Sequence, residues 1–410
     1  MRAKFVSSIQ EISAEHWNAL WPSNYPFTLH GFLKALEESA SVCGSAGWQP
    51  RHLLIFDDSD TEPQLLAAMP LYEKNNSTGE YVFDWAWADA YCRHGLEYYP
   101  KLLCAIPFTP ATGPRVGFSS SALEADKVEC LLVIMKALRE RLKTSQGSGF
   151  HCLFPNAEQR LLFNDRRFDE FDFVERLGCQ FHWFNQSFNS FDDFLQSFSS
   201  RKRKNVKRER RKVNEQGVIH QFRPAADISA QEWQEFYQLY RRTYAIHSGH
   251  VGYLNTKFFM LAAQNLPYNM LLATAHLRDT NSPMLAAALF FRDQNTLYGR
   301  YWGTRMDYDG LHFETCYYQG IDYAIEHGLN RFDPGAQGEH KIQRGFTPVL
   351  TSSFHFLQHP DFHQAIHHFA EQERGHVLAY AQDCRTSLPF REQWVSCSSD
   401  TLLNNTRMFR

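Results

Sequence analysis

Apolar residues recur along this chain with two spacings, and the changes between them mark the predicted elements. Recurrence every three or four residues predicts a helix with one buried face. Such helices are predicted around Trp17 and at Phe32–Glu38, Trp233–Tyr244 and Asn255–Leu266. Short β-rich runs predict strands at His52–Phe56, Gln64–Tyr72, Tyr81–Trp87, Met270–His276, Met284–Arg292 and Thr296–Gly303.

Each set of strands is followed by one more helix and one more strand. The helices are predicted at Ala122–Lys143 and His312–His327, and the strands at Phe150–Phe154 and Arg331–Pro334. Gly328 follows the second helix, as is typical where a left-handed residue ends a helix. Helices, a meander, and a helix that crosses to a further strand predict an α+β fold with mixed strand pairing.

The two halves of the chain share short blocks of sequence. Ile12–Trp17 returns as Ile228–Trp233, 216 residues later. Leu53–Ile55 and Leu66–Tyr72 return as Leu271–Ala273 and Leu285–Phe291, 218 and 219 residues later. Blocks that keep their order at nearly one offset indicate an internal duplication.

The duplication sets the predicted domain organisation. At about 150 residues per domain, 410 residues suit two or three domains. We predict an N-terminal domain at residues 1–185 and a C-terminal domain at residues 186–383 that opens with a basic helix at 199–213. Residues 384–410 have little periodicity and are expected to form a tail.

Composition, targeting segments and cysteine content together indicate the cellular compartment of the protein. The hydrophobic share of 43% and the charged share of 21% are ordinary for a globular protein, whereas 15% aromatic residues imply thick cores or an aromatic-lined cleft. The N-terminus lacks the apolar core of a signal peptide, and no apolar run approaches the ~18 residues of a membrane span. Nine scattered cysteines without a CxxC pair predict neither a disulfide framework nor a zinc ribbon. We therefore expect a soluble cytoplasmic protein with reduced thiols.

A strongly basic stretch follows a predicted helix at Phe191–Phe198. Nine of the twelve residues from Arg201 to Lys212 are basic, and only Glu209 is acidic. The net charge of the chain is −3, so this positive charge is local. That many like charges repel one another unless an anion neutralises them.

Three interpretations of this stretch compete. It is a solvated charged face, a nonspecific nucleic-acid patch, or a fixed cationic wall for a phosphate-rich substrate. No aromatic residue is interleaved, as stacking on single-stranded bases would need. We favour the wall, with a charged tRNA, a nucleotide-linked precursor or a pantetheine donor as its ligand. The phosphate-binding residues would be Arg203, Lys204, Lys207, Arg208 and Arg211.

A glycine-punctuated basic loop follows the last predicted strand. Gly335, Gly338 and Gly345 let backbone N–H groups approach a ligand. Lys341 and Arg344 suit a phosphate or a carboxylate. We expect Gly335, Gly338 and Arg344 to bind the donor; the alternative is a solvated surface loop.

Several stretches resemble a known family. They are Phe32–Glu38, Gly79–Trp87, Pro107–Pro110, Gly113–Arg115, Arg203–Gly217, Arg300–Gly303, LHFETCYYQGIDYAIEHGL and FDPGAQGEHKIQRGF. On these residues, which spread over nearly the whole chain, the sequence resembles the predicted N-acyltransferases of peptidoglycan biosynthesis/recognition. That family is related to the Fem peptidyltransferases and to the wider GNAT superfamily. The resemblance implies two GNAT-like domains in tandem, in agreement with the duplication.

The resemblance also implies an activity. The Fem-like basic helix that ends in Gly-Val matches Lys207, Arg208, Lys212, Gly217 and Val218, and the strand, glycine loop and Lys match Phe332, Asp333, Gly335, Gly338, Lys341 and Phe346. It implies transfer of an acyl or aminoacyl group from an aminoacyl-tRNA or acyl-CoA to an amine, on a peptidoglycan-precursor-like molecule or a small peptide or amino substrate. No tightly bound cofactor is expected. The Arg/Gln-x-x-Gly-x-Gly loop of acetyl-CoA-binding GNAT enzymes is absent from the sequence, which argues against a conventional CoA site in either half.

Acyl transfer to an amine needs stabilisation of an oxyanion and a path for the amine proton. Lys341 is the candidate to stabilise the oxyanion or a phosphate, and Arg344 would anchor an anionic group. The resemblance to GNAT-like folds implies a splayed strand pair that presents backbone N–H groups to the donor carbonyl; the alternative oxyanion hole then involves no side chain. Asp333, Glu314 or His340 is expected to accept the proton.

The first copy lacks the basic loop, because Phe150–Phe154 leads into Pro155–Glu158. Its polar-aromatic stretch is the candidate acceptor site, with Asp84, Trp85, Trp87, Asp89, Tyr91 and Arg93. Tyr301 and Trp302 in the second copy are further candidates, although strand aromatics more often pack in cores. We expect the two copies to enclose a groove, with the acceptor on the side of the first copy and the activated acyl group on the second.

Two alternatives stay open. His359, His363 and His367 are spaced to share a helix face, but Pro360 interrupts them and no carboxylate motif completes a metal site, so we expect surface histidines. The alternative to an enzyme is a non-catalytic module that recognises a phosphate-rich cell-wall precursor or RNA.

Overall fold

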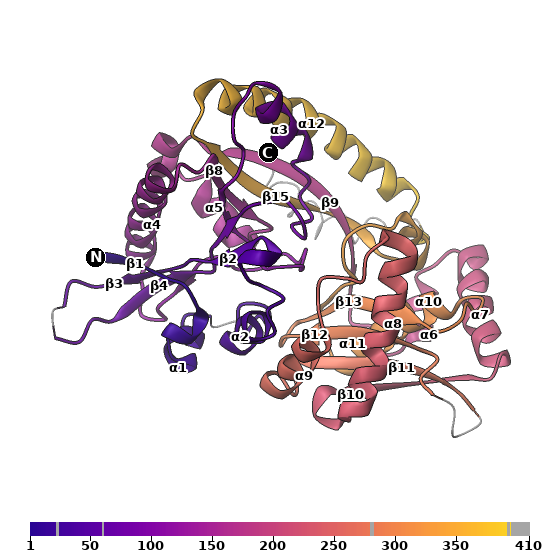
Figure 1. Cartoon of the computed structure of the whole chain (residues 1–410). Helices are drawn as coiled ribbons and strands as arrows, with labels where there is room; N and C mark the ends of the chain where they lie inside the picture. Colours follow the sequence, from indigo (N-terminus) through magenta and orange to yellow (C-terminus); the bar gives the residue numbers. More distant parts are fainter. Residues whose placement is uncertain (22–23, 60, 279–282, 392–393, 395–410) are drawn as a thin grey trace. The chain divides into compact units, whose positions relative to one another are not determined.

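The computed structural model describes residues 1–21, 24–59, 61–278, 283–391 and 394 (Figure 1). The chain forms two compact units. Unit 1 consists of Met1–Gly178 and Thr351–Leu378, and unit 2 of Cys179–Leu350 and the chain from Ala379 onwards. This division differs from two consecutive halves because Thr351–Leu378 returns to the first unit. None of the helices described combines the length and the apolar character that a membrane span requires.

Unit 1 contains two small sheets. The first has the order β1-β3-β4-β7 and is antiparallel, and the second joins β2, β5, β6, β8 and the end of β15. In the second sheet β6 runs parallel to β8, and the other pairs named are antiparallel. The strands are β1 Arg2–Val6, β2 Trp48–Pro50, β3 His52–Phe56, β4 Leu65–Met69, β5 Tyr72–Lys74, β6 Lys101–Cys104, β7 Gly117–Phe118 and β8 Gly149–Leu153. The helices are α1 Ala14–Asn18, α2 His30–Glu38, α3 Trp85–Arg93, α4 Glu124–Ser145 and α5 Ala157–Phe163, with short 3-10 turns η1 Ile9–Glu11, η2 Gly44–Ala46 and η3 Arg166–Phe171.

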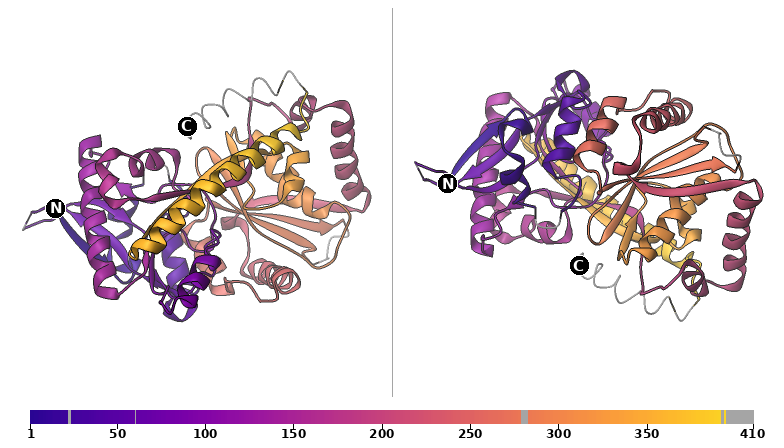
Figure 2. Two further views of the ribbon diagram at one scale, coloured as in Figure 1. Left: turned by 90° about the horizontal axis from the view of Figure 1, so that it is seen from above. Right: turned by 90° about the horizontal axis from the view of Figure 1, so that it is seen from below.

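Unit 2 contains one sheet with the strand order β10-β11-β12-β13-β14-β9. The pairs are antiparallel except β13 and β14, which run parallel. The strands are β10 Val218–Pro224, β11 Met270–Leu277, β12 Ala286–Arg292, β13 Thr296–Thr304 and β14 Arg331–Asp333. Helices α6 Phe191–Gln196 and α7 Ser200–Glu215 precede β10, and η4 Ala225–Asp227, α8 Ala230–Ser248 and α9 Thr256–Asn265 follow it. After β13 come α10 Leu311–Phe313, the π-helical segment η5 Glu314–Tyr318 and α11 Gln319–Glu326; η6 Glu339–Arg344 follows β14. The sheet has α8 on one face and α11 on the other (Figure 2).

Two long strands carry the chain from one unit to the other. β9, Val174–Phe184, starts in unit 1 and ends in unit 2, where Trp183 pairs with Phe332 of β14. β15, Thr347–Leu357, starts in unit 2 and ends in unit 1, where it pairs with β8. The long helix α12, Pro360–Thr386, follows it. Each unit is therefore completed by a strand that enters from the other part of the chain.

The structure confirms the tandem α+β duplication. Ser13 and Ser229 occupy equivalent N-caps, and each side-chain oxygen accepts a hydrogen bond of 3.2 Å from the backbone N–H three residues later. Trp17 and Trp233 are buried in the first turn of each helix. The repeated Leu-Leu blocks lie in β3 and β11, which each pair antiparallel with the strand that follows them, β4 and β12. The shared sequence therefore marks shared structural positions.

Two sequence predictions need correction. Tyr81–Trp87 is not a strand: Tyr81 has a left-handed φ of 64°, and Asp84 stands at the N-terminus of α3. The aromatic residues of this segment favour a strand locally. Glu80 and Asp84, however, form buried ion pairs with Lys101. The predicted helix His312–His327 is interrupted by the π-helical segment η5. Of the predicted tail at 384–410, the first three residues belong to the end of α12, and residues 392–393 and 395–410 lie outside the described residues.

Candidate functional site

The parallel strands β13 and β14 separate in the middle of unit 2. Their register ends at the pair Tyr298 and Asp333, while β13 continues to Thr304. Pro334 follows Asp333 and has no N–H to extend the ladder. The register of β13 against β12 also shifts here, as in a β-bulge. The separated strand ends and the glycine loop that leaves β14 form the base of the candidate site.

Asp333 fixes the start of this loop. Its carboxylate is 1% exposed, lies 3.1 Å from Arg300 Nη2, and accepts a 2.8 Å hydrogen bond from the Gly335 N–H. Burial by itself raises the pKa of Asp333, but Arg300, His182 and the Gly335 N–H together hold the pKa below its ordinary value. A carboxylate so strongly stabilised as the anion is a weak proton acceptor. Its geometry fits a positioning role.

Lys341 holds the other end of the loop. Its side chain is buried, and its Nζ donates hydrogen bonds to the carbonyl oxygens of Gly335 at 2.6 Å and Ala336 at 3.4 Å. Burial lowers the pKa of Lys341 to about 8. Gly335 and Gly338 have φ values of 91° and 102°, a region that favours glycine. The loop is thus a built turn around an ammonium group rather than a freely solvated segment.

His340 is the candidate base that reaches solvent. It lies exposed on η6, and its Nε2 is 2.9 Å from Tyr317 Oη. Partial burial, together with Lys341 and Arg344, lowers the pKa of His340 below its ordinary value, so the imidazole is neutral at pH 7. If Nε2–H donates to Tyr317, Nδ1 keeps a lone pair that can accept a proton.

The basic helix α7 packs directly against this loop. Glu209 accepts hydrogen bonds of 3.0 Å from Arg344 Nη2, and Lys202 donates to Gln343. The Arg344 guanidinium also covers the ring of Phe313 at 3.3 Å and donates to the His340 carbonyl at 2.7 Å. Lys341 and α7, which were predicted to act together, therefore lie in one unit. The Arg344 guanidinium already has these partners within the protein. That Arg344 anchors the donor stays a prediction.

Glu314 lies on the π-helical segment and is paired with α7. Arg210 Nη2 is 2.8 Å from Glu314 and 2.6 Å from Asp322, and Gln319 also donates to Glu314 at 2.8 Å. Its carboxylate is buried and has cationic and amide donors around it. This arrangement suits a structural ion pair more than the proton acceptor that the sequence suggested.

The remaining cations of α7 form an exposed stripe. Val206 and Val213 are the buried positions of the helix. Arg201, Lys204, Lys207, Arg208, Arg211 and Lys212 are exposed, and at helical spacing they share the opposite face. Lys207, Arg211 and Lys212 have carboxylate partners at 2.7, 3.5 and 2.7 Å. Within the described residues no ion pair is recorded for Arg201, Lys204 or Arg208, and the half-buried Arg203 lies off this face.

The predicted acceptor residues divide into exposed and buried sets. In α3 of unit 1, Trp85, Asp89 and Arg93 are exposed. Asp84, Trp87 and Tyr91 are buried, as is Tyr301 in unit 2, whose ring contacts Tyr240; Trp302 is half-buried beside His312. The buried set therefore belongs to the cores of the two units. A groove between the copies stays a prediction.

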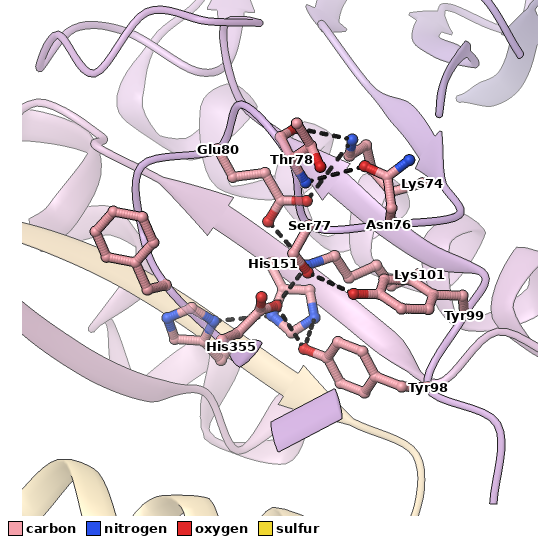
Figure 3. Close-up of polar contacts among 12 residues, drawn as sticks. Lys74, Asn76, Ser77, Thr78, Glu80, Tyr98, Tyr99, Lys101, His151 and His355 are labelled. Carbon is pink, nitrogen blue, oxygen red and sulfur yellow. Dashed lines mark hydrogen bonds and ion pairs between the residues drawn. The ribbon is translucent and has the colours of Figure 1, made fainter. Parts of the chain in front are cut away.

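Asp84 belongs instead to a buried ionic network in unit 1. Figure 3 labels its members Lys74, Glu80 and Lys101. Lys101 Nζ donates to Glu80 at 2.8 Å, to Ser77 Oγ at 2.9 Å and to Asp84. Further members are Lys74 (3.9 Å from Glu80), Tyr98 (2.7 Å to Asp84), and His151, which lies 2.8 Å from His355. Sequence reasoning singled out Asp84 but missed Lys74, Glu80, Tyr98, Lys101 and His151. The available signal was Lys101 at the start of β6, directly before Leu102 and Leu103.

Burial controls the protonation of this network. It raises the pKa of Glu80 to about 7 and lowers the pKa of Lys74 to about 7. It also lowers the pKa of His151 to about 3, helped by Lys101, so this histidine is neutral. Burial alone would raise the pKa of Asp84, but Lys101 and His151 outweigh it and lower the pKa. The network thus holds paired charges and neutral imidazoles away from water.

The three predicted surface histidines do not share a site. His359 precedes Pro360, the first residue of α12. His363 is buried and lies 3.2 Å from Asp172, whereas His367 is exposed and 3.7 Å from Glu371. No group of metal-ligating side chains gathers in the residues that the structure covers.

The sequence and the structure are similar to those of known proteins. The sequence profile of the FemAB-like family, described as peptidoglycan biosynthesis/recognition, matches residues 8–392. The crystal structure of FemX is similar at 14% sequence identity and a TM-score of 0.52, over 90% of this chain and 100% of that one. The C-terminal domain of a predicted lysylphosphatidylglycerol synthetase from Agrobacterium fabrum is similar at 10% identity and a TM-score of 0.50, over 88% of this chain and 96% of that one. No curated protein sequence matches this chain.

Proposed function

The chain belongs to the FemAB-like family and has a Fem-like tandem of GNAT-like units, and from this premise we propose that it transfers an aminoacyl group from aminoacyl-tRNA to an amine. The acceptor would be an amine of a peptidoglycan-precursor-like molecule or a small peptide. Fold alone does not establish activity, so the proposal rests on the site in unit 2.

The observation that carries the proposal is the exposed cationic face of α7 beside the loop of Lys341. Arg201, Lys204 and Arg208 recur at three- and four-residue spacing over roughly 10 Å of helix, at about 1.5 Å per residue. Cations in a row suit successive phosphates of a nucleic-acid backbone. On its inner side the same helix bonds to η6 through Glu209 and Arg344. A carrier bound along α7 would therefore be held on the helix that braces the candidate catalytic loop.

The chemistry needs a neutral amine nitrogen to attack the carbonyl carbon of the aminoacyl ester. The new C–N bond forms, the C–O bond to the ribose breaks, and the oxyanion of the tetrahedral intermediate needs hydrogen-bond donors. We assign the amine proton to His340 Nδ1, because His340 is exposed and neutral. The imidazolium so formed then returns this proton to the leaving ribose oxygen. Lys341 is the candidate side chain for the oxyanion, and Asp333 positions the loop. Glu314 braces α7.

The donor is tested by the salt dependence of binding. Each phosphate contact contributes about 0.7–0.9 to the slope of log affinity against log salt. The triple variant Arg201→Ser, Lys204→Ser, Arg208→Ser should bind tRNA with a slope reduced by roughly 2–3. Lys136→Ser, Lys143→Ser, Arg166→Ser removes the same charge from exposed positions of unit 1 and should leave the slope unchanged. Equal slopes in both triple variants would contradict the proposal.

Catalysis is tested by turnover of the labelled aminoacyl-tRNA with amine acceptors. His340→Gln should lower turnover by about 10²–10⁴-fold, as for a lost general base, while tRNA affinity stays the same. Because the pKa of His340 lies below its ordinary value, turnover of the wild type should fall on acidification only below about pH 6.5. Specific tRNA binding without turnover of any donor, acyl-CoA included, would instead indicate the non-catalytic module.

A further inference from the structure

A hollow of about 530 Å³ opens beside the C-terminal half of α7 in unit 2. Its walls come from α7, from β10 and from the π-helical region. α7 contacts both β10 and η5. The volume falls within the roughly 300–1,000 Å³ of small-ligand sites. None of the residues predicted to bind the acceptor lines it.

The charges around this hollow are balanced. The Arg210 guanidinium is paired with Glu314 and Asp322, and Arg211 has Glu215 at 3.5 Å. Burial, followed by the charge of Arg210, lowers the pKa of His220 to about 4, so its ring is neutral. The hollow therefore offers hydrogen bonds without a surplus of positive charge, in contrast to the outer face of α7.

Three lining side chains each use one polar atom in the protein and keep a second. Gln319 Nε2 donates to Glu314, which leaves its carbonyl oxygen as an acceptor. Asn214 Oδ1 accepts from Arg278, which leaves its amide N–H groups as donors. His220 Nε2 lies 2.9 Å from Thr315 Oγ1, which leaves Nδ1. Donors and acceptors of this kind recognise the polar edge of a base.

Apolar side chains complete the hollow. Val213, Val218 and Ile219 line it; Val213 and Val218 are buried and Ile219 is exposed. An unstacked base is held by stacking on aromatic rings or guanidinium planes and by hydrogen bonds to its edges. Among the lining residues, His220, Arg210 and Arg211 carry such planar groups. Phosphate, by contrast, would find Arg210 already neutralised.

We propose that this hollow binds one unstacked nucleobase of the RNA whose phosphates lie along α7. Arg211 belongs both to the exposed stripe and to the wall of the hollow, so the two surfaces are continuous. This inference rests on the proposed function, because it takes the carrier to be a ribonucleotide chain. It adds a selective contact to a helix that otherwise reads only the backbone.

The test uses a tRNA acceptor minihelix with four unpaired 3′ nucleotides, in which each unpaired base is removed in turn. Removal of one particular base should weaken binding by about 5- to 100-fold, as for bases held by protein side chains. Ile219→Trp enlarges an exposed residue that lines the hollow and should weaken binding of the intact minihelix by a similar factor. With that variant, removal of the same base should cost nothing further.

Gln221→Trp is the matched control, since Gln221 is exposed two residues along the same face of β10 and does not line the hollow. Asn214→Ala, an exposed substitution, provides a second variant should Ile219→Trp unfold. If the minihelix fails to bind the wild type at low salt, the proposed function and this inference both fall. Suppose instead that the minihelix binds through α7, but removal of no single base weakens binding by more than about twofold, or Ile219→Trp binds as tightly as Gln221→Trp. Then the inference of a nucleobase in the hollow is wrong, while the proposed function stands.

Discussion

The two units treat their charges in opposite ways. Unit 1 buries Lys74, Glu80, Asp84 and Lys101 in one network, where each charge has a partner of the opposite sign. Unit 2 carries its largest cluster of cations on the outside of α7. Charges sealed from water hold a structure in place, because removing one leaves its partner uncompensated. Charges left in water are free to meet a ligand.

The same contrast appears where the last strand of each copy ends. In unit 1, Phe154 and Pro155 lead straight into α5, whose N-cap Asn156 accepts a 3.0 Å hydrogen bond from the Gln159 N–H. In unit 2, Asp333 and Pro334 lead into the glycine loop and η6. A duplicated strand end thus became a plain helix start in one copy and a candidate site in the other.

The largest expected effect tests the buried network. Lys101→Met leaves Glu80 and Asp84 without their shared ammonium group and should lower the free energy of unfolding by about 3–5 kcal/mol. Urea denaturation measures it. Lys101→Met combined with Glu80→Gln and Asp84→Asn removes the stranded charges and should recover part of the loss. A loss below about 1 kcal/mol in the single variant would mean that the network is not sealed.

The second-largest expected effect is a pH dependence of stability caused by the neutral histidines of unit 1. Because burial lowers the pKa of His151 to about 3, the unfolded chain binds a proton that the folded chain refuses between pH 6.5 and 3. Wild-type stability should therefore fall on acidification, with about 1.4 kcal/mol per pH unit from this group. His355 adds a loss of the same sign, whereas Glu80, whose pKa is raised, opposes both between pH 7 and 4.5.

His151→Asn isolates the contribution of this one group. The unfolding free energy of the variant, measured from pH 6.5 to 4.5, should change less steeply than that of the wild type by about 1.4 kcal/mol per unit. Parallel curves would show that His151 is protonated in the folded protein.

Equivalent helix caps give a smaller effect. Ser229→Ala removes a capping box in which Ser229 and Glu232 bond reciprocally, and should cost about 1–2 kcal/mol. Ser13→Ala removes a single cap bond and should cost about 0.5–1 kcal/mol. Thermal unfolding of the two variants compares the copies directly; a greater loss at Ser13 would reverse the expected order.

The smallest effect on stability is expected on α7. Lys204→Met removes an exposed cation with cationic neighbours and should change the free energy of unfolding by less than about 0.5 kcal/mol. Differential scanning calorimetry of Lys204→Met and Lys101→Met compares an exposed with a buried lysine directly, since both variants replace lysine by methionine. A large loss at Lys204 would mean that this cation has a structural partner.

Local pattern predicted the elements but not the partners. His52–Phe56 is a strand with those bounds, and Gly328 has the left-handed φ of 63° expected after a helix. Lys101 and Glu80 are 21 residues apart, and His151 and His355 are 204 apart, so no spacing rule connects them. For the same reason the local pattern of Tyr81–Trp87, which is rich in strand-forming residues, predicts a strand. The ion pairs of Glu80 and Asp84 with the distant Lys101 are not visible in that pattern.

The candidate site shows the same limit. The sequence identified the glycine loop and the basic helix from composition, since nine cations in twelve positions need no partner to be noticed. It did not distinguish Arg344 and Arg210, which are occupied by Glu209 and Glu314, from the cations that face water. That distinction depends on which side of α7 packs against η5 and η6.

The exchange of β9 and β15 has a practical consequence for anyone who cuts the gene. A fragment that stops at residue 185 would lack Thr351–Leu378, and with it the strand that pairs with β8 and the imidazole that faces His151. A fragment that starts at residue 186 would lack the whole of β9, including the Trp183 that pairs with β14. Two copies that arose by duplication can thus no longer be expressed as two self-sufficient pieces, and a bipartite version would need both fragments produced together.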